Sequence, residues 1–357
     1  MDERIEVGGD APYPVVLGEG IDLAGALEGA MESGPCALLT DSEVGVHHAG
    51  AVVRALERGG WRVVSVVEVP PGERSKSLET YGRAAAALAR DGLTRDGTLF
   101  ALGGGVVGDL GGFLAATYMR GVGLVMLPTS LLAMVDSAVG GKTGIDLPEG
   151  KNLLGAFVRP RAVVADLAWL RTLPEREVSC GLAEVVKMGL LCGGGFFEDL
   201  ALVGAARGGD MAAVRTLVAR SVRFKASVVA SDERERGRRA ILNYGHTIGH
   251  GIEAACGYEI RHGEAVAVGM LAEADLSRER FGRDLLGLHR ELVGLAGLPS
   301  RAPGVRVRDV LLAMRRDKKR TQKDVHRFVL LRDVGEPVWG VEVGEEEAGR
   351  AVERVVA

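Results

Sequence analysis

Residues 98–109 read TLFALGGGVVGD, an apolar run that leads directly into three successive glycines, Gly103–Gly105. A buried strand followed by a glycine turn is typical of a dinucleotide site, because bare backbone can approach a pyrophosphate there. In a chain with 52 glycines, a tight strand-to-helix turn explains the same letters equally well. The run also stands in the middle of the predicted sheet, so its meaning depends on the surrounding pattern.

Short apolar runs alternate with helical patterns on both sides of this turn. This alternation predicts an α/β domain with a Rossmann-like parallel sheet over residues 1–173. The predicted strands are Cys36–Leu39, Arg62–Val67, Thr98–Leu102, Leu124–Leu127 and Ala162–Ala165, with helices at 44–58 and 78–90.

The pattern changes at Leu173-Pro174, and the remaining residues favour helices. At 357 residues the chain exceeds the size at which a single core usually stops growing, so we expect a second, all-α domain over residues 174–357. A strand-like run, Phe328–Leu331, lies in that half or between the halves. The predicted helices cover residues 176–191, 211–230, 243–255, 264–281 and 310–318.

Composition excludes several classes of function. The net charge is −4 and basic residues do not alternate with aromatic ones, which argues against nucleic-acid binding and favours a small-molecule substrate. The longest apolar stretch, Gly121–Val135, is broken by Pro128, and residues 1–4 are polar, so we expect a cytoplasmic protein without a membrane segment. The four cysteines show no Cys-x-x-Cys spacing, which argues against a redox dithiol or a four-cysteine zinc site.

Three of the seven histidines, His246, His250 and His262, fall within 17 residues. Residues four apart share a helix face, so His246 and His250 can converge on a divalent metal, and His262 can close the site. Glu184 can supply a carboxylate. It lies three residues before Lys187 on an apolar helix, where a surface ion pair is the simplest explanation. Their neighbours look buried, however, and a buried pair needs a metal, ligand or further partner.

Cations and an amide are set among glycines between Asp136 and Asn152, an arrangement that suits a bound anion. Gly141-Lys142-Thr143 resembles the end of a phosphate-binding P-loop, but Asp136 stands where that motif needs glycine, which argues against an ATPase. Glu235 and Arg239 directly precede the histidine segment and can reach the same cleft.

Taken together, six segments resemble the 3-dehydroquinate synthase family of sugar-phosphate cyclases over nearly the full length. The resemblance implies an N-terminal NAD-binding domain, a helical C-terminal domain with zinc or cobalt, and a substrate between them. It also implies conversion of 3-deoxy-D-arabino-heptulosonate 7-phosphate to 3-dehydroquinate and phosphate, in the shikimate pathway to chorismate and the aromatic amino acids, by a homodimer. The segments are residues 103–109, 116–121, 128–133, 135–144, 181–187 and 242–253.

The same resemblance implies roles for individual residues. The metal ligands would be Glu184, His246 and His262, so that His250 turns to the substrate phosphate instead. Lys225 and Arg239 would bind the substrate carboxylate, and Asp136, Lys187 and Glu235 its hydroxyl-bearing centre. The phosphate set would be Lys142, Asn152, Asn243, His250 and one of Lys318 or Lys319, with Arg120 of a dimer partner as an open addition. NAD would contact Asp41, Glu73, Lys76, Gly103, Gly104, Gly105, Asp109, Thr129, Ser130, Lys142, Lys151 and Thr172.

Three alternatives stay open at this point. An aminodehydroquinate synthase would use the same groups, whereas cyclases that make cyclitols bind no carboxylate, so Lys225 and Arg239 argue against them. A metal-dependent, glycerol-dehydrogenase-like enzyme would release NADH and would not need two anion sites. A catalytically silent NAD- or metal-binding protein ranks last, because every polar group sought is present.

Overall fold

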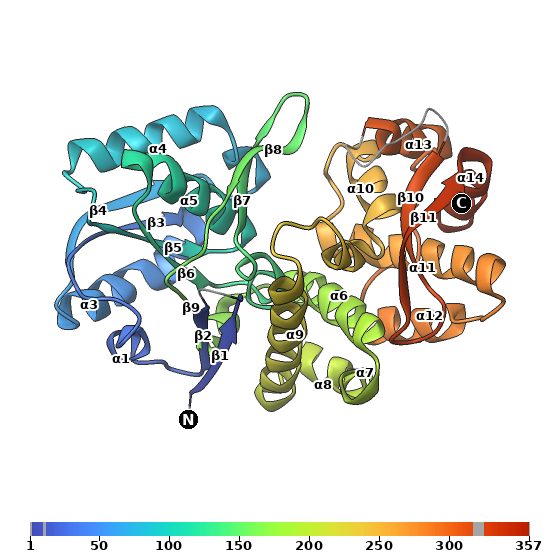
Figure 1. Cartoon of the computed structure of the whole chain (residues 1–357), viewed down its shortest axis with the longest axis horizontal. Coiled ribbons are helices and arrows are strands. Elements are labelled where there is room, and N and C mark those ends of the chain that lie inside the picture. The colour runs from blue at the N-terminus through green and yellow to red at the C-terminus, as the bar shows by residue number, and fades with distance from the viewer. Residues whose placement is uncertain (1, 10–11, 317–324, 357) are drawn as a thin grey trace. The chain divides into compact units, whose positions relative to one another are not determined.

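The computed structural model describes residues 2–9, 12–316 and 325–356. It divides into two compact units (Figure 1). The first unit comprises Met1–Pro174 and Lys225–Glu233, and the second comprises Glu175–Phe224 and Arg234–Ala357. A border at residues 173 and 174 alone does not describe this division, because Lys225–Glu233 also belongs to the first unit. Helix α9 (Met211–Ser231) starts in the second unit, but its last turns pack with the first.

A seven-stranded sheet forms the centre of the first unit, in the order β1-β2-β9-β6-β5-β3-β4. Only the β1–β2 pair is antiparallel, and the other neighbours run parallel. The predicted parallel sheet is thus confirmed and gains the edge strands β1 and β2. The strands are β1 (Glu3–Val7), β2 (Tyr13–Gly18), β3 (Pro35–Asp41), β4 (Arg62–Val69), β5 (Thr98–Gly103), β6 (Gly123–Pro128) and β9 (Ala162–Asp166).

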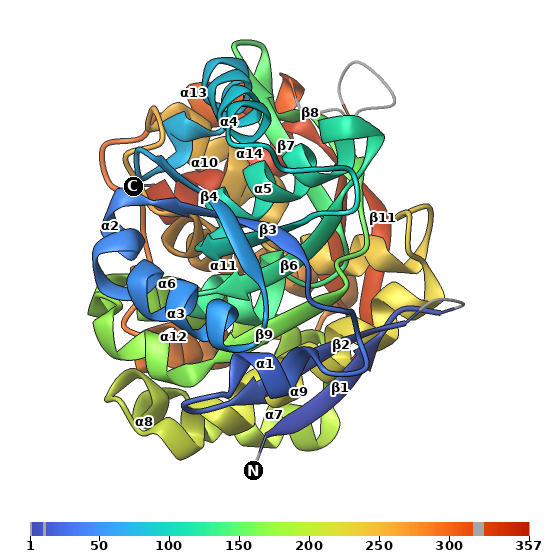
Figure 2. The ribbon, with the colours of Figure 1, turned by 90° about the vertical axis from the view of Figure 1, so that its left-hand side faces the viewer.

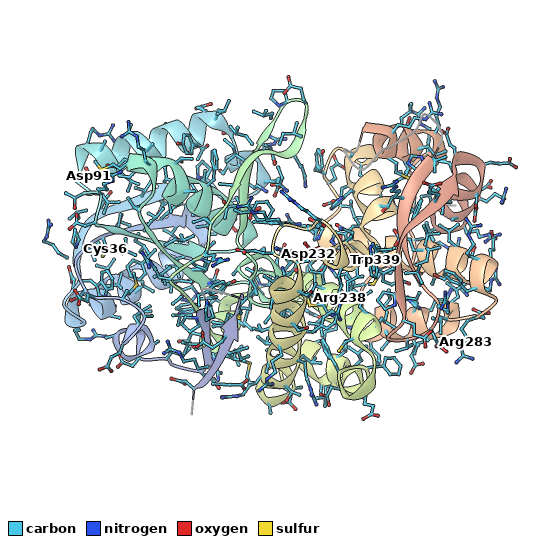
Figure 3. The ribbon with its side chains drawn as sticks, viewed as in Figure 1. Cys36, Asp91, Asp232, Arg238, Arg283 and Trp339 are labelled. Atoms are coloured by element: carbon cyan, nitrogen blue, oxygen red, sulfur yellow. The ribbon has the colours of Figure 1, made fainter. Side chains whose placement is uncertain are left out.

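Helices cover both faces of this sheet, which explains why its central strands are apolar throughout. Helices α4 (Leu78–Arg90) and α5 (Gly105–Thr117) lie on one face, and α1 (Leu23–Leu27) and α3 (Gly50–Arg58) on the other (Figures 1 and 2). Cys36 of β3 is fully buried in the core beneath α1 and α3 (Figure 3). A separate hairpin of β7 (Lys142–Leu147) and β8 (Gly150–Phe157) packs on α5.

The strand order places a topological switch point between β3 and β5. From β3 the chain proceeds to β4 on one side, and from β5 it proceeds to β6 on the other. Loops diverge at the carboxyl ends of two such strands and leave a crevice where ligands bind in open α/β sheets. The glycine turn after β5 and Asp41 at the end of β3 both lie at this point.

Helix α11 (His262–Phe281) organises the second unit. It is buried from Ala265 to Ser277 and packs against α6, α10, α12, α14 and strand β10. A helix enclosed on all sides is the centre of a helical core. The other elements are α6 (Glu175–Cys192), α7 (Gly194–Asp199), α8 (Val203–Arg207), α10 (His246–Ala255), α12 (Leu286–Leu295), α13 (Val307–Arg316), α14 (Glu345–Val356) and the hairpin of β10 (Val325–Leu331) and β11 (Pro337–Gly344).

Two predictions for the second unit need correction. The domain was expected to be all-α, but the strand-like run Phe328–Leu331 forms part of the β10–β11 hairpin, so the unit is mainly rather than entirely helical. The helix predicted from Asn243 begins instead at His246, because Gly245 adopts a left-handed conformation with φ +78° that interrupts the helix. Among the described helices, none combines the length and apolar character needed to cross a membrane.

Gly263 provides a test of how closely α11 packs on α6. A Cβ at this position would lie 2.3 Å from the carbonyl oxygen of Cys180, which is backbone and cannot rotate away. We expect Gly263→Ala to lower the free energy of unfolding by about 2 kcal/mol or more, measured by urea denaturation. Gly287→Ala in α12 is the control, since its Cβ would meet open space. Equal stability of the two variants would contradict the close packing.

Candidate active site

Three helices of the second unit bring together one carboxylate and two imidazoles. Glu184 lies within α6, whereas His246 and His262 are the first residues of α10 and α11. Oε1 of Glu184 is 3.6 Å from Nε2 of His246 and 3.4 Å from Nε2 of His262. The three ligand atoms lie within 4.8 Å of one another. These are the residues that the family resemblance implied.

The surroundings of Glu184 fit a divalent metal. Its side chain is fully buried, and Lys187 forms an ion pair with Oε2, whereas Oε1 accepts no regular hydrogen bond from any described residue. Distances of 3.4 and 3.6 Å are too long for hydrogen bonds to the imidazoles. Four tetrahedral bonds of about 2.1 Å separate zinc ligands by about 3.4 Å, so donor types and spacing both suit such an ion.

Charge sets the protonation state of this group. Burial raises the pKa of Glu184, but the positive charges of Lys187 and His262 outweigh this effect and lower the pKa to about 2. Burial and the charge of Lys187 hold the pKa of His246 well below its usual value. Glu184 is therefore ionised and His246 neutral at pH 7, the states that a metal requires. Burial also lowers the pKa of His262, but Glu184 and Glu253 outweigh it and raise the value to about 10.

Backbone contacts orient His246. Its Nδ1 lies 3.0 Å from the carbonyl oxygen of Tyr244 and must donate to it, because a carbonyl only accepts. The free electron pair is then on Nε2, which faces Glu184. The N–H of Gly245 donates to Glu273 at 2.6 Å, which holds the left-handed turn in place.

His289 is buried behind this turn. Its Nδ1 donates to the carbonyl of Leu285 at 2.8 Å, so its Nε2 accepts from the hydroxyl of Tyr244 at 2.7 Å. His289 therefore supports the segment that carries His246, without reaching the proposed metal.

Sequence reasoning missed Glu253. This buried residue of α10 places Oε1 3.4 Å from Nδ1 of His262 and Oε2 3.9 Å from Nε2 of His250. Its spacing was a usable signal, because it stands three residues after His250 and seven after His246, on one helix face. His250 groups with Glu253 and His262, rather than with Glu184 and His246. The geometry thus favours the resemblance over the first expectation that His246 and His250 share a metal.

The other residues expected near the substrate form pairs within each unit. In the first unit, Nζ of Lys225 donates to Oδ1 of Asp136 at 2.5 Å. In the second, Nδ2 of Asn243 donates to Oε1 of Glu235 at 2.6 Å, and Glu235 has a positive φ of 53°. Arg239 is buried, Arg120 and Lys142 are exposed, and Lys318 and Lys319 lie outside the described residues.

In the first unit, the glycine turn leads into an anion-binding geometry. Helix α5 begins at Gly105, and its N-cap, Gly104, has no side chain to occupy the first N–H groups. Such N–H groups at a helix N-terminus favour phosphate. Thr129 donates its N–H to the carbonyl of Gly103 at 2.9 Å, and Oγ of Ser130 accepts from the N–H of Ala133 at 3.2 Å. Thr129 thus holds the turn through its backbone, whereas Ser130 stabilises the segment that follows it.

The buried ammonium group of Lys76 links this residue to three others expected at the cofactor, Asp109, Glu73 and Lys151. Nζ of Lys76 donates to Asp109 at 2.8 Å and to Oδ1 of Asn152 at 2.6 Å, and it lies 3.5 Å from Glu73. Lys151 lies 3.4 Å from the same oxygen of Glu73. Asn152 was expected at the substrate phosphate, but its amide oxygen is bound to Lys76, on a backbone with φ +52°.

Two further residues expected at the cofactor, Asp41 and Thr172, stabilise local structure. Oδ1 of Asp41 caps α2 (Ser42–Val44) by accepting the N–H groups of Glu43 and Val44 at 3.0 and 2.9 Å. Thr172 lies 2.8 Å from Nε2 of His48 and donates to the carbonyl of Trp169. Asp41 lies at the switch point, so its cap also positions the loop that follows β3.

Comparison with known proteins places this geometry in a family. Models of the N-terminal and C-terminal parts of 3-dehydroquinate synthase match residues 66–180 and 181–320. A 3-dehydroquinate synthase of Xanthomonas axonopodis pv. citri is 48% identical over 343 residues, which cover 93% of this chain and 92% of the relative.

Solved structures agree on the fold. A 2-deoxy-scyllo-inosose synthase complexed with carbaglucose-6-phosphate, NAD+ and Co2+ has a TM-score of 0.87 at 26% identity, covering 99% of this chain and all of its own. The 2-epi-5-epi-valiolone synthase of Streptomyces hygroscopicus, with NAD+ and Zn2+ bound, has a TM-score of 0.86 at 25% identity, covering 99% of each chain. With both halves matched by family models and a relative at 48% identity over nearly its whole length, the chain belongs to the 3-dehydroquinate synthase family.

Proposed function

We propose that this chain converts 3-deoxy-D-arabino-heptulosonate 7-phosphate into 3-dehydroquinate and phosphate, with NAD and a divalent metal as cofactors. The observation that carries the proposal is the buried carboxylate of Glu184, which faces Nε2 of His246 and Nε2 of His262 in a chain of this family. Glu184, His246 and His262 would hold zinc or cobalt, the ions present in the two similar cyclase structures.

When bound, the metal and NAD supply the Lewis acid and the hydride acceptor that turn a secondary hydroxyl of the substrate into a ketone, which acidifies the neighbouring C–H. The residues of the chain then have two tasks. They must hold a substrate with an anion at each end, and they must stabilise the phosphate as it leaves. The glycine turn and the N-terminus of α5 would bind the pyrophosphate of NAD.

The carboxylate end of the substrate would bind Lys225 and Arg239. Both side chains are buried, and a charged donor forms stronger hydrogen bonds to a carboxylate than a neutral one does. Asp136 holds the ammonium of Lys225 at 2.5 Å, which keeps this cation oriented before substrate binds. A cyclase whose substrate lacks a carboxylate would have no use for these two cations.

The phosphate end would bind His250, Asn243 and Lys142. His250 is half-exposed beside the buried metal group, so its ring can contact both solvent and a ligand. Glu235 fixes the amide of Asn243 at 2.6 Å. These groups provide the hydrogen bonds and positive charge that stabilise a departing phosphate.

Two further expectations belong to the proposal. The enzyme would be a homodimer, in which the exposed Arg120 of one subunit reaches the phosphate site of its partner. It would act in the cytoplasm, where the phosphorylated substrate of the shikimate pathway is made.

Incubation of the pure protein with the heptulosonate phosphate, NAD and zinc tests the reaction. We expect phosphate and dehydroquinate in equal amounts and no accumulation of NADH, because each turnover returns the hydride. Phosphate, dehydroquinate and absorbance of reduced nicotinamide are followed together. Net formation of NADH would identify a dehydrogenase and overturn the proposal.

Two histidine variants test the ligand assignment. His262→Ala removes a ligand atom, so tightly bound metal should be lost, measured as metal per chain after dialysis. His250→Ala should keep metal content near that of the unaltered protein and lower kcat about 100-fold, because it loses a phosphate contact. Equal loss of metal in both variants would contradict the assignment.

A further inference from the structure

We propose that Glu253 is a positioning residue that orients the ring of His262 toward the metal and links it to His250. The inference rests on the proposed role of His262 as a metal ligand, and it adds a residue that the sequence did not suggest. Glu253 lies on α10, three residues beyond His250, and its side chain is buried.

The ring of His262 lies between two carboxylates. Its Nε2 is 3.4 Å from Oε1 of Glu184, and its Nδ1 is 3.4 Å from Oε1 of Glu253. When Nε2 serves as the ligand atom, the proton of the neutral ring must reside on Nδ1. Glu253 is placed to accept that proton's hydrogen bond after a shift of a few tenths of an ångström. A carboxylate in this position fixes the ring and makes the ligand more basic.

The two histidine ligands differ in their outer contacts. Nδ1 of His246 donates to a neutral backbone carbonyl, that of Tyr244, whereas Nδ1 of His262 faces the charged Glu253. The negative charge of Glu253 would help to balance a bound dication, because Lys187 already neutralises Glu184 through a buried ion pair. A dication beside that pair would otherwise add two uncompensated charges to a buried site, which is costly. Glu253 offsets one of them.

The second oxygen of Glu253 extends the link to the proposed phosphate site. Oε2 lies 3.9 Å from Nε2 of His250, and the rings of His250 and His262 have centroids 5.9 Å apart. One carboxylate thus contacts both the metal ligand and the residue expected at the phosphate. Loss of Glu253 should therefore affect metal binding and phosphate departure together.

The test compares Glu253→Gln and Glu253→Leu. Glutamine keeps the size and one hydrogen-bond acceptor but loses the charge, whereas leucine loses both. We expect the affinity for Zn2+, measured by chelator competition, to fall about 10-fold in the first variant and about 100-fold in the second. The visible absorption of the Co2+-loaded protein should change in the same order, because the orientation of a ligand ring alters the spectrum.

Asp275→Asn is the matched control. Asp275 is also a buried carboxylate of the second unit, on α11, but its partners are Arg278 at 2.6 Å and Arg354, neither of them a metal ligand. This variant should lose stability while keeping the metal affinity and the cobalt spectrum. A purely structural role for Glu253 would make its variants behave like this control, and would overturn the inference.

Further outcomes separate the inference from the proposed function. Retention of metal by His262→Ala would contradict the ligand set itself. Loss of metal in His262→Ala, with unchanged affinity and spectrum in both Glu253 variants, would overturn only the role of Glu253. Binding of two metal ions per chain would also overturn it, since His250, Glu253 and His262 would then hold a second ion. Graded loss of a single ion supports it.

Discussion

The buried carboxylate of Glu184 places the strongest constraint on the second unit. A buried ionised group is expensive, and its Oε1 accepts no regular hydrogen bond from the described residues. Lys187, one helical turn later on α6, offsets part of this cost. The proposed metal, between the carboxylate and the two imidazoles, would offset more of it, so metal binding and the packing of three helices would depend on each other. The close contact of α11 with α6 at Gly263 serves the same arrangement, since it brings the start of α11 to Glu184.

The orientation of the two proposed histidine ligands depends on the residues that contact their rings and the adjacent backbone. Gly245 turns the chain into α10 with a positive φ, and Glu273 and Tyr244 hold that turn through hydrogen bonds to and from the backbone. On the other side, Glu253 stands behind His262. Tyr244 thus leaves Nε2 of His246 free, and by our proposal Glu253 does the same for His262. The free nitrogen decides whether a histidine can bind a metal at all.

The first unit faces a different task, since by our proposal its uncharged backbone would bind a dinucleotide. The carboxyl ends of β3 and β5 meet where the strand order reverses, and α5 starts there with a glycine at its N-cap. Next to this turn, Lys76 gathers Asp109, Glu73 and Asn152 into one buried network. Such a network is costly when incomplete, and for that reason it holds the nearby loops in one arrangement.

Local pattern in the sequence determined the elements of this protein. Apolar runs and glycine turns predicted the parallel sheet, and the four-residue spacing predicted that His246 and His250 share a helix face. The sequence also determined the set of polar groups, and through the family resemblance the three proposed metal ligands. Periodicity could not indicate the left-handed turn at Gly245, because the residues around it are compatible with a continuous helix.

Only the tertiary structure decided which distant groups meet. Lys225 pairs with Asp136, which is 89 residues away, and the amide oxygen of Asn152 accepts from Lys76. Glu253 turns toward His262 of the next helix. These pairings depend on how helices and strands pack, and packing is set by the summed contacts of the whole core rather than by any local stretch of sequence.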